Sequence, residues 1–245
     1  MPPNDQKLAQ IIAATEVVTV DDMISILQTL DRELSIDDGL KWFNLLYLKV
    51  TEGVRQQSAA VRWQNPRWLE RLDVIFANLY LAAITAWLSN RNGSARAWLP
   101  LFEARDQRGI MRVQFAFAGI NAHINRDLPI ALVETGKELR IAPRRGTREF
   151  RDFERVNGIL ETVMENTKQY IATGIVGLLD EDLGRLDDQL ANWGVRKARE
   201  TAWSNSEILW RLDRVPVLPE DFLINLDRLV SLSSRGLLVP VGKVT

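Results

Sequence analysis

Apolar residues recur along most of this chain at the spacing of an α-helix. In the segment 37–54 they follow one helical stripe, which consists of Phe43, Leu46, Tyr47, Val50 and Val54. The segment 65–90 is apolar around most of its circumference. It begins with Asn65, a favoured N-cap residue, and with Pro66 at the first helical position. This pattern predicts a long central helix that is buried on most sides.

The same periodicity predicts three further helices, at 110–124, 150–178 and 195–213. Thr147 is placed to cap the second of these. Alternating strand patterns between Asn-Gly or Asp-Gly turns are missing. We therefore predict an all-α fold, a single-domain helical bundle over residues 1–245, with an N-terminal helix or arm at 1–20 and an extended tail at 236–245.

The stretch 119–132, GINAHINRDLPIAL, interrupts the most apolar part of the chain. Four polar side chains, which we call the polar quartet, stand there on alternate positions and include the only histidine: Asn121, His123, Asn125 and Asp127. Pro129 follows, and it cannot donate a hydrogen bond to the carbonyl of Asn125. We expect the helix to kink or break between Asn125 and Leu128, with Asp127 capping the helix that restarts there.

His123 and Asp127 are neighbours whichever way the backbone runs. In a helix they stand at i and i+4, and in an extended segment they point to the same side. A carboxylate beside an imidazole fixes its tautomer and raises its pKa, which suits acid–base catalysis near neutral pH. We predict a catalytic pair of His123 and Asp127, with Asn121 and Asn125 as hydrogen-bond donors to a substrate oxygen. The structural alternative is that the quartet only satisfies backbone groups that the proline leaves unpaired.

Further polar residues lie on apolar helix faces. Asp73 shares a face with Tyr80, Asn157 lies on an apolar stripe, and Arg199 is close to Trp203. A buried charge needs a partner, so an internal salt bridge or cap is the alternative explanation for each. Together with the quartet they predict one polar cavity, in which Asp73, Asn157 and Arg199 bind substrate and Tyr80 and Trp203 line the apolar wall.

Composition narrows the choice of partners. Lys and Arg number 31 and Asp and Glu 32, and a net charge of −1 does not favour nucleic acid or a membrane surface. The absence of cysteine excludes disulfides, and with the lack of a signal peptide or an uncharged spanning run it favours a cytoplasmic location. One imidazole is too few for a typical zinc or iron site, and the acidic stretch 178–190 lacks the spacing of a calcium loop. No cofactor is predicted, although a single histidine would suffice as an axial ligand of haem.

The stretch 117–132, FAGINAHINRDLPIAL, resembles an uncharacterised, mostly bacterial all-α family that is recognised by a Gly-x-Asn-Ala-His-Ile-Asn-x-Asp-Leu motif. The resemblance extends over most of the chain through the blocks 42–54, 72–80, 151–160 and 198–210. It implies that the polar quartet belongs to a family pattern with these residues near it: Asp73, Asn157, Arg199 and Trp203. No activity follows from it.

The function we expect from the sequence is acid–base chemistry on an apolar, oxygen-bearing small molecule, as in a cyclisation, isomerisation or hydrolysis. The expected partner is that small molecule, and a homodimer is left open. A non-catalytic protein that binds a hydrophobic ligand or a cofactor such as haem is one alternative. A helical scaffold in which the quartet is purely architectural is another, and it predicts no cavity near the quartet.

Overall fold

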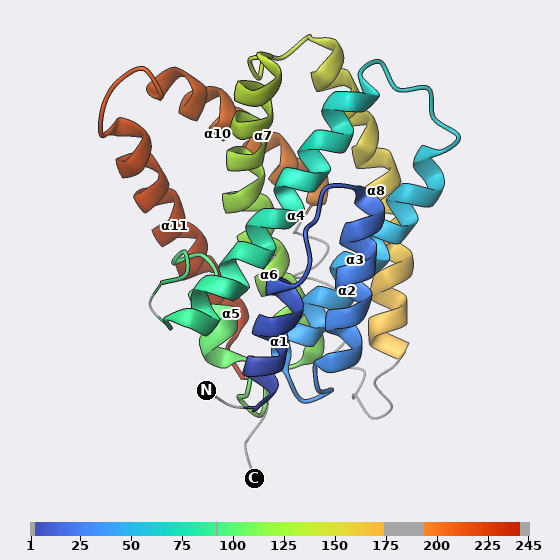
Figure 1. Cartoon of the computed structure of the whole chain (residues 1–245), viewed down its shortest axis with the longest axis vertical. Helices are drawn as coiled ribbons and strands as arrows, with labels where there is room; N and C mark the ends of the chain where they lie inside the picture. The colour runs from blue at the N-terminus through green and yellow to red at the C-terminus, as the bar shows by residue number, and fades with distance from the viewer. Residues whose placement is uncertain (1–2, 92, 174–193, 241–245) are drawn as a thin grey trace.

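The computed structural model describes residues 3–91, 93–173 and 194–240, which form an all-α bundle (Figure 1). No β-strand occurs within these ranges, as the periodicity predicts. The helices are α1 (Pro3–Ala13), α2 (Val20–Glu33), α3 (Gly39–Ser58), α4 (Pro66–Ser89), α5 (Leu99–Ala104), α6 (Arg112–Ala122), the π-helical turn η1 (His123–Asp127), α7 (Leu128–Leu139), α8 (Arg148–Thr173), α10 (Val195–Leu212) and α11 (Leu218–Leu237).

Helix α4 runs through the middle of the bundle, as predicted. It contacts α1, α2, α7, α8 and η1. The side chain of Asn65 accepts a hydrogen bond from the N–H of Trp68 at 3.3 Å, and Pro66 stands in the first turn. By length and composition this helix is also long and apolar enough to cross a membrane. This property is not revealed when only uncharged runs of the sequence are considered. A core helix meets the same criteria, and 56% of its most apolar window is buried inside the bundle.

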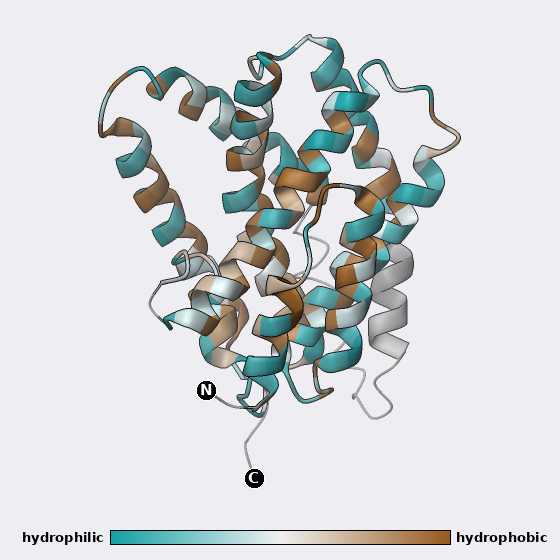
Figure 2. Cartoon of the chain, in the orientation of Figure 1, coloured by the Kyte–Doolittle hydropathy of each residue, from teal (hydrophilic) through white to brown (hydrophobic). Residues whose placement is uncertain are grey.

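Aromatic side chains fill much of the core around α4. The largest fully buried side chains are Trp98, Trp203, Tyr80, Phe43, Phe102 and Phe153. Complete burial of a large apolar side chain stabilises a fold by roughly 1.5–3 kcal/mol. Helix α3 packs against α2, α6 and α8, so the N-terminal half of the chain covers one side of the continuous α6–η1–α7 rod. Figure 2 shows apolar residues concentrated where these helices face one another.

A buried guanidinium connects the N-terminal helix to the start of α3. Arg105 donates from Nε to Asp38 at 3.0 Å and from Nη1 to Asp5 at 3.1 Å, and Arg91 donates to the second oxygen of Asp5 at 2.7 Å. Burial would lower the pKa of Arg105, but its hydrogen bonds and the charges of Asp38 and Asp5 raise it more. The charges of Arg105, Asp38 and Asp5 compensate one another inside the fold, and Arg91 joins them from the surface.

The ends of several elements can be compared with the predictions. Thr147 caps α8 by accepting a hydrogen bond from the N–H of Phe150 at 3.2 Å, as predicted. The N-terminal segment 1–20 contains α1 and a short connection to α2. Helix α11 continues to Leu237, so its last two residues fall in the segment predicted as an extended tail. Residues 241–245 of that tail, the last part of the helix predicted to 178 and the acidic stretch 178–190 lie outside the described residues.

Candidate functional site

The polar quartet lies on and next to a π-helical turn. The turn η1 joins α6 to α7 without interruption, and the N–H of Leu128 donates to the carbonyl of His123, five residues back. Pro129 has no N–H for the carbonyl of Asn125, so the wider turn accommodates a residue that a regular α-helix would not. The predicted break is therefore a π-turn inside a continuous helix. Asp127 makes no capping bond to α7, which corrects that prediction.

Asp127 does not cap α7 because three other groups hold its carboxylate. His123 Nδ1 lies 3.0 Å from Oδ2, Trp98 Nε1 donates to Oδ2 at 3.0 Å, and Arg126 Nη1 donates to Oδ1 at 2.8 Å. Because a carboxylate oxygen accepts the hydrogen bond from the ring, the proton of the neutral imidazole is assigned to Nδ1. The predicted contact of His123 with Asp127 is present, and Nε2 is left as the acceptor atom.

Aromatic rings enclose the imidazole of His123. The ring of Phe76 lies parallel to it, with centroids 3.5 Å apart and planes 6° apart, and the ring of Tyr47 is steeply inclined to it, with centroids 4.7 Å apart. Nε2 is buried and has no hydrogen-bond partner within the described residues. Burial lowers the pKa of His123, and the hydrogen bond and charge of Asp127, which raise it, do not offset this. The net shift is opposite to the one expected from the sequence, because removing the ring from water outweighs the carboxylate.

The two amides of the quartet face α11. Asn121 Nδ2 donates to the carbonyl of Val230 at 3.0 Å and to Oγ of Ser234 at 2.9 Å, and Asn125 Nδ2 donates to Oδ1 of Asn121 at 2.8 Å. These hydrogen bonds attach the π-turn to the neighbouring helix. The two amides and the imidazole are therefore not brought together around one space.

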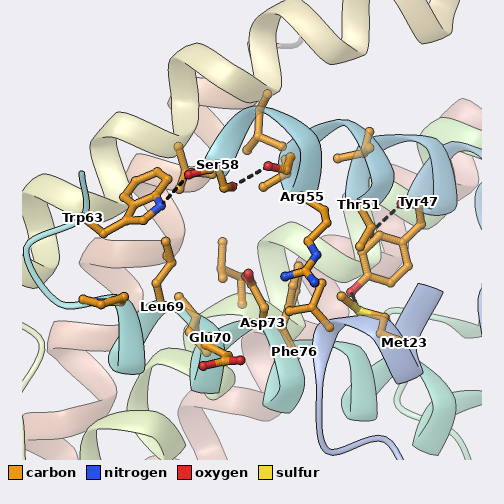
Figure 3. Close-up of a pocket in the computed structure, with 18 of the residues that line it drawn as sticks. Met23, Tyr47, Thr51, Arg55, Ser58, Trp63, Leu69, Glu70, Asp73 and Phe76 are labelled. Carbon is orange, nitrogen blue, oxygen red and sulfur yellow. Dashed lines mark hydrogen bonds between the residues drawn. The ribbon is translucent and has the colours of Figure 1, made fainter. Parts of the chain in front are cut away.

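A cavity of about 620 Å³ lies on the other side of the Phe76 ring. Figure 3 shows that side chains of α3, among them Thr51 and Ser58, and side chains of α4, among them Asp73 and Phe76, point into the same space. Most of its lining is apolar: Val50, Val54, Leu69, Leu72, Leu128, Val156 and Leu160. Exposed residues of the lining mark its rim: Arg55, Ala59, Pro66 and Glu70.

Asp73 is the acidic group inside this cavity. Its side chain is enclosed by protein yet only partly buried, because part of its surface faces the cavity. Burial raises the pKa of Asp73 from 3.8 to about 7, the charge of Arg199 lowers it and the charge of Glu70 raises it further. Arg199 acts on Asp73 through its charge and not through a hydrogen bond. Within the described residues, no hydrogen bond or ion pair satisfies this carboxylate.

Arg199 extends from α10 to the same cavity, and residues of α8 hold its guanidinium in place. Its Nε donates to Oδ1 of Asn157 at 2.7 Å, its Nη2 donates to the carbonyl of Phe153 at 3.2 Å, and the guanidinium lies 4.0 Å from the centre of the Phe153 ring. Burial lowers the pKa of Arg199 to about 10, while the charge of Asp73 raises it. Arg199 stays charged at neutral pH, and Nη1 makes none of these hydrogen bonds.

The structure therefore places some of the predicted site residues at the cavity and the others away from it. Asp73 and Arg199 line the cavity, and Asn157 positions Arg199. Tyr80 and Trp203, predicted as cavity wall, are core residues: the hydroxyl of Tyr80 lies 3.4 Å from Oδ1 of Asn44, and Trp203 Nε1 donates to Glu207 at 3.2 Å. The catalytic pair predicted from the sequence lies behind the wall that Phe76 forms and does not line the cavity.

Sequence reasoning missed the residues that form the floor of the cavity, Tyr47 and Phe76. Phe76 stands at i+3 from Asp73, on the same face of α4, so the helical spacing contained this signal. Burial raises the pKa of Tyr47 well above its ordinary value, and its hydroxyl is a donor whose partner is the sulfur of Met23, at 3.3 Å. The position of Tyr47 beside Asp73 depends on how α3 packs, which no local pattern reveals.

Comparison with known proteins places the chain in a family. The family described as "Family of unknown function (DUF5995)" matches residues 20–240. The chain belongs to this family. The DUF5995 match covers α2 to α11 and hence both the π-turn and the cavity, which confirms membership of an uncharacterised family as the resemblance implied. No curated protein and no solved structure matches the chain.

The described residues contain no group of three or more His, Cys, Asp or Glu side chains that could hold a metal ion. For haem, the histidine that would serve as the axial ligand lies against the Phe76 ring, which separates it from the cavity. The residues lining the cavity instead suit an organic molecule with one polar end.

Proposed function

We propose that this chain is an enzyme that binds a small, largely apolar molecule in the α3–α4 cavity and uses Asp73 for proton transfer. The observation that carries this proposal is a carboxyl group with a pKa of about 7 and no bonded partner among the described residues, inside an apolar cavity. At neutral pH such a group exists in both protonation states, which is the condition for efficient general acid–base catalysis. This assigns to Asp73 the role that the sequence suggested for His123.

Arg199 supplies the complementary function. Nε and Nη2 are fixed by Asn157 and Phe153, so the guanidinium is held rigidly beside Asp73. A fixed cation next to the base can stabilise negative charge that develops on a carbonyl oxygen. The Tyr47 hydroxyl, which a sulfur atom binds only weakly, is a second donor on the cavity floor.

Of the reactions considered, isomerisation next to a carbonyl group needs the fewest additional groups. Asp73 as a carboxylate removes a proton from the carbon beside the carbonyl, and the electron pair moves to the oxygen, which Arg199 stabilises. In a substrate with a carbon–carbon double bond next to that carbon, Asp73 then returns the proton to the far carbon of the double bond, and the double bond moves into conjugation with the carbonyl that re-forms. The apolar walls hold the rest of the molecule and exclude water.

Proton exchange tests this function. The wild-type protein is incubated in deuterated buffer with a panel of apolar ketones small enough for the cavity, and exchange at the carbon beside the carbonyl is followed by NMR. We expect exchange to depend on Asp73 and to fall by about 10²–10⁴-fold in Asp73→Asn. The surface variant Asp213→Asn, whose carboxylate pairs with Lys137 on the outside, is the matched control and should exchange as the wild type does. Undiminished exchange in Asp73→Asn would refute the assignment.

The predominantly apolar lining favours a second candidate, a protein that binds a hydrophobic ligand without changing it. In that case a ligand copurifies or binds, is recovered unchanged, and binds to Asp73→Asn as well. Mass spectrometry of the bound fraction before and after incubation distinguishes the two candidates. The hydrogen bonds of Asn121 and Asn125 to each other and to α11 agree with an architectural role for that part of the quartet.

Chemical modification tests the separation of His123 from the cavity. Diethylpyrocarbonate reacts with accessible imidazoles, and His123 is the only histidine in the chain. We expect slow modification in the wild type and fast modification in Phe76→Ala, which removes the ring between the cavity and the imidazole. Fast modification of the folded wild-type protein would restore His123 as a candidate for direct catalysis.

The cytoplasmic location favoured by the lack of cysteine remains part of this proposal.

A further inference from the structure

Helix α11 carries a stripe of apolar residues beside the face that it buries. The buried face contains Val230 and Ser234 and contacts α6. The neighbouring stripe, here called the α11 stripe, has four apolar residues and one polar residue at its centre: Leu218, Phe222, Asn225, Leu229 and Leu232. Leu229 and Leu232 are 67% and 70% exposed, the largest values among the exposed hydrophobic residues of the described chain. A single exposed leucine is ordinary, whereas several exposed leucines along one face of a helix mark an interaction surface.

The spacing of the stripe indicates what kind of element would cover it. Its residues alternate between steps of four and three, which is the spacing of the core positions of a coiled coil. The partner that such a stripe fits is another helix lying alongside it. Helix α11 stands at the edge of the bundle with apolar residues along it, where a second helix could approach (Figures 1 and 2).

Charges beside the stripe identify the partner. Asp221 and Arg228 are exposed, stand seven residues apart and flank the stripe on the side away from the bundle. Neither side chain has an ion pair or hydrogen-bond partner within the described residues. Two α11 helices in antiparallel orientation place Asp221 of each copy opposite Arg228 of the other. The same register places Leu218 opposite Leu229.

The opposite orientation lacks this match. In a parallel pair, these flanking positions would face the other flank of the stripe, which carries Pro219, Leu226 and Ser233 and hence no charge. Either orientation is compatible with the two-fold symmetry that most homodimers have, so the charge match decides between them. We propose that a second copy of this chain covers the α11 stripe and that the two α11 helices pair in antiparallel orientation to form a homodimer.

The size of the stripe sets the expected strength. The 20 residues of α11 span about 30 Å, and a strip of one helix width along that length buries less surface than a standard interface. The dimer should therefore dissociate reversibly on dilution. Sedimentation velocity over a dilution series should show a monomer–dimer equilibrium for the wild-type protein.

Two sets of variants test the surface. The double variant L229E/L232E should weaken association by at least about a hundredfold, whereas V18E, at a residue that is also exposed but precedes α2, should not change it. Circular dichroism of each variant checks that the fold is kept. A wild-type chain that stays monomeric at its highest soluble concentration, or a dimer that L229E/L232E leaves intact, overturns the proposal.

Charge reversal tests orientation and register without touching the apolar residues. D221R gives both flanking positions a positive charge and R228D gives both a negative charge, so each variant alone should associate more weakly than the wild type. An equimolar mixture of D221R and R228D should form heterodimers, because every flanking pair then has opposite charges. A mixture that associates no better than its separate components overturns the antiparallel register.

Discussion

Replacing Asp73 with Asn should make the protein more stable at neutral and alkaline pH. Burial raises the pKa of Asp73 from 3.8 to about 7 in the folded state, with the opposing charge of Arg199 already included. The difference between these two pKa values corresponds to about 4 kcal/mol, because each tenfold change in proton affinity is worth about 1.36 kcal/mol. This is an upper bound, because water in the cavity screens the charge, and we expect about 1–3 kcal/mol.

The sign follows from where the proton is bound. Between pH 3.8 and about 7 the folded state keeps a proton on Asp73 that the unfolded state has released. The free energy of unfolding contributed by Asp73 therefore falls as the pH rises through this range, and it stays low above it. The amide of the Asp73→Asn variant carries no charge at any pH, so the substitution removes this slope and stabilises the fold most above the folded-state pKa.

Urea denaturation of the wild type and of Asp73→Asn at about pH 5 and about pH 8 measures the effect. The difference in unfolding free energy between the two proteins should grow with pH. Glu70→Gln changes an exposed carboxylate one turn earlier on α4 and should keep most of the wild-type pH dependence. An Asp73→Asn variant that is less stable than the wild type at about pH 8, or that keeps the wild-type slope, would refute the proposed ionisation of this group.

Two further substitutions, each compared with a control variant, test the packing of the bundle. Arg105→Met should lower the unfolding free energy by about 3–5 kcal/mol, because it leaves the buried Asp38 without its cation and Asp5 with Arg91 alone. Arg235→Met, at an exposed ion pair, should cost at most about 1 kcal/mol. Chemical denaturation compares the two variants, and equal losses would contradict this explanation. Gly119→Ala should lower the melting temperature, because the added Cβ would lie 2.2 Å from Cγ of Phe43. Gly236→Ala, whose added Cβ meets nothing within 4 Å, should raise the melting temperature slightly through helix propensity. The opposite order in thermal melting would show that α3 and α6 are not packed this closely.

The sequence predicts the long helices well where a single apolar stripe or a cap marks them. Helix α4 and the start of α8 are predicted with their capping residues Asn65 and Thr147. Helix α11 was not predicted, because its apolar residues lie on two sides, one packed against α6 and one exposed, and two overlapping stripes hide the periodicity. A local pattern is clear when one face of a helix is buried, or when a cap marks the start of a helix that is apolar on most sides, as in α4.

The candidate site is predictable only in part, for a related reason. The i, i+4 spacing correctly predicts that His123 touches Asp127, because the chain stays helical through the π-turn. Polar residues on apolar faces likewise identify Asp73 and Arg199. The location of the empty space depends on how α3, α4 and α10 pack, and the ring of Phe76 decides on which side of the wall the imidazole lies. Contacts between segments that are distant in the sequence determine where the cavity ends, and helical spacing does not predict these contacts.

The π-turn has a consequence for the evolution of the α6–α7 rod. One additional residue in a turn acts as an insertion that the helix absorbs locally, so α7 keeps the rotational phase that a shorter, regular helix would have. Deleting one residue between His123 and Asp127 should therefore leave α6 against α3 and α7 against α4 and α10. The deletion would move His123 and the carboxylate that accepts from Trp98 from i, i+4 to i, i+3, which are also neighbours on a helix, so their hydrogen bond would have to form with a different geometry. A homologue with a rod one residue shorter would therefore keep the bundle and hold the imidazole and the carboxylate on one face of a regular α-helix.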